Sequence, residues 1–212
     1  MYGIKLLSVV FVAAAFLGGC AYKTSAPVSP SYNVYSNYED KVPGRFALYV
    51  NASSMRGEFK VDGLACSAHT YPMDASSAFK TSTLRTLANL VEDIEVVPTP
   101  LSRDRLKSGE YDGQIIVELE DMDVRLRMIP GFWTSEMEAD VELTASIRVD
   151  GREGRVLGTT VSSDEHAKAE AGGACEGGAN AISDATSDAL EELMQKLGER
   201  FANSERVRAL GS

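Results

Sequence analysis

A run of about 50 residues, from Gln114 to Ser163, alternates apolar and polar side chains in three successive segments. Side chains of a β-strand point alternately to the two faces of a sheet, so such alternation is typical of strands with one buried face. The sequence PGFW separates the first two segments and DGREG the next two, and both are turn-forming. The run therefore predicts a three-strand meander with one apolar face and one charged face.

The same run predicts a register for its first hairpin. A turn at PGFW sets opposite charges against each other on one face and apolar residues on the other. Leu119 and Met122 are three residues apart, so we expect a one-residue bulge near Glu120 and Asp121 to restore the apolar phase. The expected pairs are Arg127 with Glu136, Arg125 with Glu138, Leu126 with Met137, Met122 with Val141, Leu119 with Leu143 and Val117 with Ala145.

Two further segments carry the three-and-four spacing of apolar residues that is typical of amphipathic helices. The first covers Met73–Val91 and the second Ile182–Phe201. Short strands are expected over Arg45–Asn51 and Asp93–Pro98, with a helical or irregular connection after the second. A sheet with one apolar face needs helices to cover it. The pattern predicts an α+β two-layer sandwich with a mixed, mostly antiparallel sheet and both helices on one face.

The chain begins with a short apolar segment. Lys5 precedes the apolar residues Leu6–Leu17, and two glycines supply the small residues that stand before a cleavage point. The sequence LGGC resembles the bacterial lipobox. The resemblance implies that residues 1–19 are removed, that Cys20 is lipidated and, because Ala21 is not aspartate, that the protein is sorted to the periplasmic face of the outer membrane. A plain secretory signal is the alternative.

The rest of the chain divides by composition. Residues 20–44 are rich in Ser, Pro, Tyr and Asn, so we expect a flexible tether. In the alternative, the four tyrosines of this segment let it lie on a partner. Residues 45–208 are the length of one periplasmic domain, and residues 209–212 form a tail. The formal net charge is −10, and removing Lys5 with the signal makes it −11. Such an acidic chain repels phosphate backbones, so nucleic acid is not an expected partner.

Two cysteines remain besides Cys20. Cys66 and Cys175 each lie shortly before an expected helix, which would place them at the same end of the domain. An even pair in an oxidising compartment predicts a disulfide. Two separate buried thiols are the alternative. A zinc site with His69 and His166 is disfavoured, because the spacing is not that of a zinc finger or ribbon.

The sequence contains no motif that indicates catalysis. The nucleophile elbow, Walker loop, dinucleotide-binding and HExxH patterns are absent. His166 stands beside Asp164 and Glu165, but neighbours on an extended segment face opposite sides, so we expect a solvated strand end. An acidic row that could bind calcium is interpreted as a solvated face; it comprises Glu136, Glu138, Asp140 and Glu142. We expect no enzyme activity, cofactor or metal.

An apolar cluster at the first turn is the candidate contact site. Turns are usually polar, and apolar residues on a loop often contact a partner or lipid. Trp133 is the only tryptophan of the chain, and the nearby arginines suit an anchor rimmed by positive charge. Folding of Trp133 over the open end of the sandwich is the alternative. The candidate residues are Met128, Ile129, Phe132, Trp133, Arg125 and Arg127.

Three segments together resemble envelope lipoproteins with a small α/β domain of the anticodon-binding-domain-like type. They are SSAFKTSTLRTLANLVEDIEVVP, YDGQIIVELEDMDV and the closing helix ISDATSDALEELMQKLGERF. Similar proteins include the curli secretion-pore lipoprotein, activators of penicillin-binding proteins, the Pel exopolysaccharide lipoprotein and YajG-like lipoproteins. The resemblance implies a non-catalytic adapter or assembly component of an envelope or export machine, with a protein partner or a homo-oligomeric form. A lipid-handling partner of an outer-membrane barrel, similar to that of lipopolysaccharide assembly, is the first alternative, and an unrecognised hydrolase is the second.

Overall fold

The structure is a computed structural model, and it describes residues 21, 23–25, 32–63, 65–108 and 110–212. The α+β class and the mixed sheet expected from the sequence are confirmed. The strands of the main sheet are β1 (Val42–Asn51), β3 (Val61–Asp62), β5 (Val91–Val96), β6 (Gly113–Ile129), β7 (Glu136–Gly151) and β8 (Arg155–Glu170). They are ordered β5-β1-β6-β7-β8, and β3 pairs with β6 beyond the end of β1.

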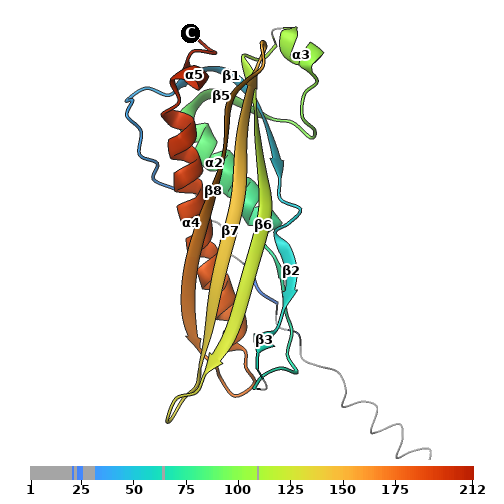
Figure 1. Cartoon of the computed structure of the whole chain (residues 1–212), viewed down its shortest axis with the longest axis vertical. Coiled ribbons are helices and arrows are strands. Elements are labelled where there is room, and N and C mark those ends of the chain that lie inside the picture. The colour runs from blue at the N-terminus through green and yellow to red at the C-terminus, as the bar shows by residue number, and fades with distance from the viewer. Residues whose placement is uncertain (1–20, 22, 26–31, 64, 109) are drawn as a thin grey trace, which may run out of the picture.

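The sheet combines parallel and antiparallel pairs. β1 lies parallel to both of its neighbours, β5 and β6, whereas β6, β7 and β8 pair antiparallel in chain order. These last three strands are 17, 16 and 16 residues long. At about 3.3 Å per residue each spans roughly 50 Å. They run the length of the molecule, so that the β6–β7 turn lies at one end and the β7–β8 turn at the other (Figure 1).

The observed register of the β6–β7 hairpin differs from the predicted one by two residues. Arg127 lies opposite Glu138, and the bulge falls between Leu119 and Asp121, where the sequence predicted it. The loop is centred between Phe132 and Trp133, whereas the predicted register centres it between Gly131 and Phe132. Because side chains alternate between the two faces, a register shift of two residues leaves every side chain on its predicted face. The other corrected pairs are Arg125 with Asp140, Leu126 with Ala139, Met122 with Leu143, Leu119 with Ala145 and Val117 with Ile147.

Two long helices pack against the sheet. They are α2 (Ser76–Leu90) and α4 (Gly177–Ala202), and the short helices α3 (Arg103–Lys107) and α5 (Glu205–Arg208) lie near the β7–β8 turn (Figure 1). α4 contacts β7 and β8, α2 contacts β1 and β5, and the two helices contact each other. Phe46 and Phe201 meet edge to face between sheet and helix, at 6.3 Å between ring centroids. None of the described helices combines the length and the apolar composition that crossing a membrane requires.

Both long helices start at residues other than the predicted ones. α2 starts at Ser76, because Tyr71–Asp74 forms a strand, β4, that pairs antiparallel with β2 (Arg56–Phe59) in a small second sheet. α4 starts five residues before Ile182, with two glycines. A Cβ on Gly178 would lie 2.7 Å from the ring of Tyr71, so close packing explains a helical turn that carries no apolar period.

The described part of the expected tether packs on the domain. The side chain of Tyr32 is buried, and the backbone N–H of Asn37 donates to Asn203 Oδ1 at 2.7 Å. The guanidinium of Arg208 lies 4.0 Å from the ring centre of Tyr38. β1 begins at Val42, before the predicted boundary. Part of residues 32–44 therefore packs on the domain instead of forming a solvated linker, although Tyr35 stays mostly exposed.

Candidate functional site

The loop between β6 and β7 presents two aromatic side chains to solvent. Phe132 is 89% exposed and Trp133 is 90% exposed, and their rings meet edge to face with centroids 4.8 Å apart. A Cβ on Gly131 would overlap the carbonyl of Thr134, so the loop closes tightly at this glycine. We call the segment from Pro130 to Ser135 the aromatic tip. The alternative in which Trp133 folds back over the sandwich is wrong.

The residues just before the aromatic tip belong to the body of the domain. Met128 and Ile129 end β6 and are half-buried. Met128 packs against the core, with its sulfur 3.7 Å from Cys66 Sγ. The predicted apolar cluster therefore divides into two half-buried residues that anchor the loop and two exposed residues, Phe132 and Trp133, that are available for contact.

The two arginines near the aromatic tip are ion-paired. Arg125 Nε lies 3.3 Å from Asp123 Oδ2. Arg127 donates to Glu138 across the hairpin and lies 3.5 Å from Asp140 Oδ2. The predicted positive rim is therefore wrong, because carboxylates on the same face neutralise both guanidinium groups.

Glu138 is the centre of this charged cluster. It is buried, and Lys168 Nζ on β8 lies 3.2 Å from its second carboxylate oxygen. The hydrogen bond from Arg127 holds the pKa of Glu138 below its ordinary value, and Lys168 lowers it further against the opposing effect of burial. The same contact raises the pKa of Arg127. Among the described residues, no group of three or more His, Cys, Asp or Glu side chains is arranged to hold a metal ion.

A disulfide joins Cys66 to Cys175, the pair expected from the sequence, with Cα atoms 6.0 Å apart. Both cysteines have left-handed backbone angles, with φ of 59° and 63°. Tyr71, which is fully buried, donates its hydroxyl hydrogen to the carbonyl of Cys175 at 2.7 Å. The disulfide therefore ties the loop before β4 to the start of α4, at the end of the molecule where the β6–β7 hairpin turns (Figure 1).

Ala21 and Thr24, which follow Cys20 in the sequence, pair with residues at this same end. Ala21 forms a parallel bridge with Thr70, and Thr24 forms one with Met73. Thr24 donates to the carbonyl of Pro72 from its backbone, at 3.2 Å, and from its hydroxyl, at 2.9 Å. Cys20 and the predicted signal peptide lie outside the described residues.

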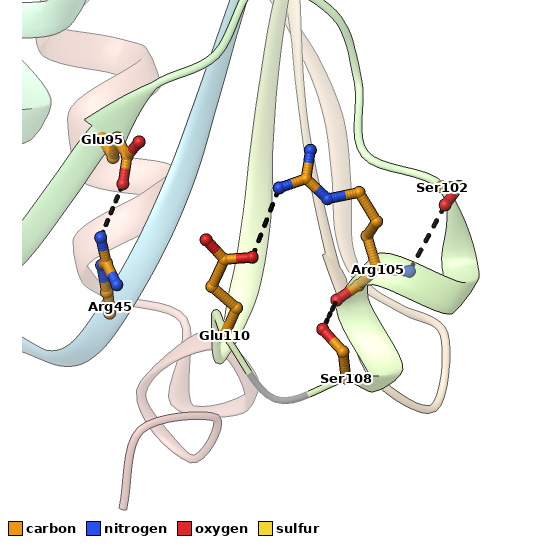
Figure 2. Close-up of polar contacts among 6 residues, drawn as sticks. All are labelled: Arg45, Glu95, Ser102, Arg105, Ser108 and Glu110. Atoms are coloured by element: carbon orange, nitrogen blue, oxygen red, sulfur yellow. Dashed lines mark hydrogen bonds and ion pairs between the residues drawn. The ribbon is translucent and has the colours of Figure 1, made fainter.

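The opposite end of the molecule is polar. Figure 2 shows Arg45 paired with Glu95 at 2.7 Å, and Arg105 with Glu110 at 3.3 Å. Ser102 caps α3 by accepting from the backbone N–H of Arg105. Burial, together with a hydrogen bond to Glu95, raises the pKa of Tyr111 in the same region. These contacts hold the connection after β5 in place.

The two histidines lie on different elements. His166 is exposed on β8, opposite Asp140 of β7. His69 lies in the turn before β4, where its backbone N–H donates to the carbonyl of Cys66 at 3.0 Å. The neighbours of His166 along β8 alternate between the two faces of the strand, as the sequence predicted.

A groove of about 550 Å³ lies between the ends of β1 and β5 and the first turns of α2. Leu48 and Leu84 contribute to its apolar lining, and Arg56 and Lys80 supply positive charge. Arg56 is itself paired with Asp74 at 3.0 Å. Sequence reasoning missed this groove, because its lining comes from segments whose spatial relation depends on the parallel β1–β5 pairing.

No family model matches this chain, and no curated protein matches it. Among solved structures, the chain is similar to a Xanthomonas campestris protein assigned to the DUF330 family model, with 8% identity, a TM-score of 0.44, and coverage of 85% of this chain and 93% of that one. A hypothetical protein from Chlamydia trachomatis matches with 8% identity, a TM-score of 0.41 and coverage of 74% and 97%. A minor lipoprotein from Acinetobacter baumannii matches with 9% identity, a TM-score of 0.40 and coverage of 77% and 93%.

Proposed function

We propose that this protein is a lipid-anchored, non-catalytic component of a bacterial envelope, which works as an adapter or assembly factor at the periplasmic face of the outer membrane. Lipid on Cys20 attaches it to the membrane, and its partner is another envelope protein or further copies of itself. The observation that carries the proposal is the bridge between Ala21 and Thr70. It joins the residue after the lipobox cysteine directly to the folded domain.

This pairing supports a domain that is held close to the membrane. Several acyl chains on one cysteine hold a protein on a bilayer essentially permanently, since each buried methylene contributes about 0.8 kcal/mol. Ser183 of α4 donates to the carbonyl of Ser25 at 2.6 Å, so Ala21 and Thr24 lie against the β4 segment and Ser25 lies against α4. The domain therefore stays close to the lipid and offers its surfaces to partners at the membrane.

The anchor is tested by the intact mass of the protein made in its own host. We expect a chain that begins at Cys20 and carries acyl groups. The Cys20→Ala variant should be recovered in the soluble fraction, because it lacks the acceptor sulfur. A wild-type protein that is soluble and carries no fatty acid would falsify the proposal.

Sorting is tested at the next residue. Ala21 is exposed, so substitution leaves its backbone bridge to Thr70 in place. We expect Ala21→Asp to move the protein to inner-membrane fractions of a density gradient, whereas Ala21→Ser should stay with the outer membrane. Equal distribution of the two variants would contradict the proposed location.

The adapter role is tested by native mass measurement of the lipidated protein after gentle extraction from its host membrane. We expect a complex of defined stoichiometry, either with one other envelope protein or between copies of this chain. A chain that is monomeric in every extraction, while a gene deletion still impairs the envelope, would contradict an adapter role.

Lipid handling is a second candidate function, and the groove between β1, β5 and α2 favours it. Its volume is in the range of small-molecule sites, and an apolar lining beside the ammonium group of Lys80 suits an amphipathic anion. We expect palmitate to bind the purified protein in a calorimetric titration and Lys80→Glu to weaken that binding, while Lys107→Glu on α3 serves as the control. The same heat of binding for all three proteins would exclude the groove.

A further inference from the structure

We propose that the aromatic tip inserts into the interfacial layer of the bilayer that holds the lipid on Cys20, so that the domain contacts the membrane at two points. This inference rests on the proposed lipid anchor and adds to it a second, non-covalent contact. Phe132 and Trp133 are the residues that enter the membrane.

The first argument is the exposure of the aromatic pair. Phe132 and Trp133 are the two most exposed large apolar side chains among the described residues. Their rings meet edge to face. An apolar pair held at the end of a hairpin is exposed to water at a free-energy cost that a lipid or partner surface would remove. Tryptophan is enriched where one part of the ring meets hydrocarbon and its N–H meets water.

The second argument is position. The backbone N–H of Ala171 donates to the carbonyl of Ser135 at 2.8 Å, and the N–H of Gly177 donates to the carbonyl of Ala171, so the base of the aromatic tip is level with the disulfide loop. Phe132 and Trp133 lie two or three residues beyond Ser135, a reach of roughly 7 to 10 Å. Apolar groups of interfacial segments are buried about 5 to 10 Å into the headgroup and acyl boundary.

The third argument is the shared end of the molecule. Ala21 pairs with Thr70, and the adjacent Tyr71 contacts the carbonyl of Cys175. Ala21 pairs with the residue just before β4 and Thr24 pairs with Met73 within it, so Ala21 lies nearer than Thr24 to the disulfide loop, which precedes β4. Ala21 is therefore on the same side of the molecule as the aromatic tip, and a lipid on the preceding residue would hold that side toward the bilayer.

The charges behind the aromatic tip determine what kind of contact this is. Arg125 and Arg127 are ion-paired, and Glu136 lies opposite Glu170 where β7 and β8 meet the loop. These groups give no net attraction for anionic headgroups. The insertion is driven by apolar burial, so it should not require anionic lipid and should change little between low salt and 0.5 M KCl.

Trp133 provides the measurement, because it is the only tryptophan of the chain and its fluorescence reports on the aromatic tip alone. The lipidated full-length mature protein is reconstituted in phosphatidylcholine vesicles, with and without phosphatidylglycerol. We expect a blue-shifted emission, strong quenching by lipids brominated on their acyl chains, and at least a threefold lower accessibility to aqueous acrylamide than in the soluble Cys20→Ala chain. Emission that stays red-shifted and open to acrylamide in vesicles overturns the inference.

The experiment also uses two variants that retain Trp133 as the fluorescent probe. Phe132→Ser removes half of the aromatic pair and should reduce quenching by brominated lipid at least twofold, whereas Val96→Ser, which removes an exposed apolar side chain from β5, should leave it unchanged. Equal effects of the two variants would contradict insertion at the aromatic tip. Shielding of Trp133 in native membranes but not in pure lipid would also overturn the inference, in favour of a protein partner.

The outcomes for anchor and aromatic tip are separable. An acylated protein whose Trp133 remains in water keeps the proposed function and rejects the inference. A protein without acyl groups rejects the proposed anchor, whatever Trp133 does when vesicles are added.

Discussion

Tyr71 shows how much one side chain joins in this fold. It is fully buried, its hydroxyl donates to the carbonyl of Cys175, and its ring lies where a Cβ on Gly178 would stand. It also ends the pairing of β4 with β2, opposite Phe59. The residue thereby couples the small second sheet, the disulfide loop and the start of α4.

Removal of this hydroxyl should destabilise the protein. Tyr71→Phe removes a buried donor from the carbonyl of Cys175, and we expect the free energy of unfolding to fall by about 1 kcal/mol, the usual contribution of such a bond. Urea unfolding measures the change. Tyr35→Phe removes a hydroxyl from a side chain that is mostly exposed and should have no effect. Identical midpoints for Tyr71→Phe and wild type would show that the bond contributes nothing.

Glu138 should make stability depend on pH. Arg127 holds the pKa of Glu138 below its ordinary value of 4.5. A carboxyl whose pKa is lower in the folded state stabilises the fold above its unfolded-state pKa, and that contribution is lost as the pH falls through the folded-state pKa. Glu138→Gln should therefore be less stable than wild type at neutral pH, and the gap should close progressively below about pH 4.5.

Urea unfolding at neutral pH and at about pH 3 measures this gap. The matched control is Glu136→Gln, which removes a carboxylate of the same strand as Glu138, β7, that lies opposite Glu170 of β8. Because it relieves a like-charge pair, it should not destabilise the protein at neutral pH. A gap for Glu138→Gln that is constant with pH would contradict the proposed role of the ion pair.

At the scale of elements, the start of α4 is determined by close packing and not by helix propensity. A Cβ on Gly177 would overlap the carbonyl of Glu170, and one on Gly178 would meet the ring of Tyr71. Glycine is a poor helix former, so two in the first turn indicate that the backbone must approach β8 and β4 closely. This approach positions Cys175 for its disulfide.

Gly178→Ala should separate packing from propensity. Helix propensity alone predicts stabilisation by up to about 1 kcal/mol, whereas overpacking predicts a loss of about 1 to 3 kcal/mol. We expect the loss, because Tyr71 is buried and cannot move aside. Gly173→Ala is the control, since a Cβ there would meet nothing within 4 Å. Thermal unfolding of both variants gives the comparison, and a stabilised Gly178→Ala would refute the packing argument.

At the scale of the whole molecule, one end is held together by many links and the rest by the sheet and helices. The disulfide, the bridges made by Ala21 and Thr24, and the base of the aromatic tip all lie at the end where the β6–β7 hairpin turns. The disulfide closes a loop of 109 residues that contains β4, α2, β5, α3, β6, β7 and β8. It therefore constrains most of the unfolded chain.

Loss of this bond should destabilise the whole domain. Removing a native disulfide typically costs about 2 to 5 kcal/mol. We expect the loss for the double variant Cys66→Ser, Cys175→Ser to lie in the lower half of that range. Without the bond, positions 66 and 175 no longer have to hold a left-handed backbone conformation, which is unfavourable for residues other than glycine. Reductant should lower the urea midpoint of the wild type toward that of the variant and leave the variant unchanged. A reductant effect on the variant would show that something other than this bond is responsible.

The sequence by itself determined what is local or periodic: the alternating strands, the two amphipathic helices, the bulge after Leu119 and the turn at DGREG. It also indicated the Cys66–Cys175 pair, because both cysteines precede helices that lie side by side. Only the tertiary structure decided the hairpin register. Acidic residues recur at every second position from Glu136 to Glu142, so Arg127 finds a carboxylate in either register and the charge pattern cannot choose between them. The expectations for residues 32–44 and for Arg127 fail for a related reason. Whether a polar or aromatic side chain meets water or a partner depends on other segments that only folding brings near, such as the strand that carries Glu138.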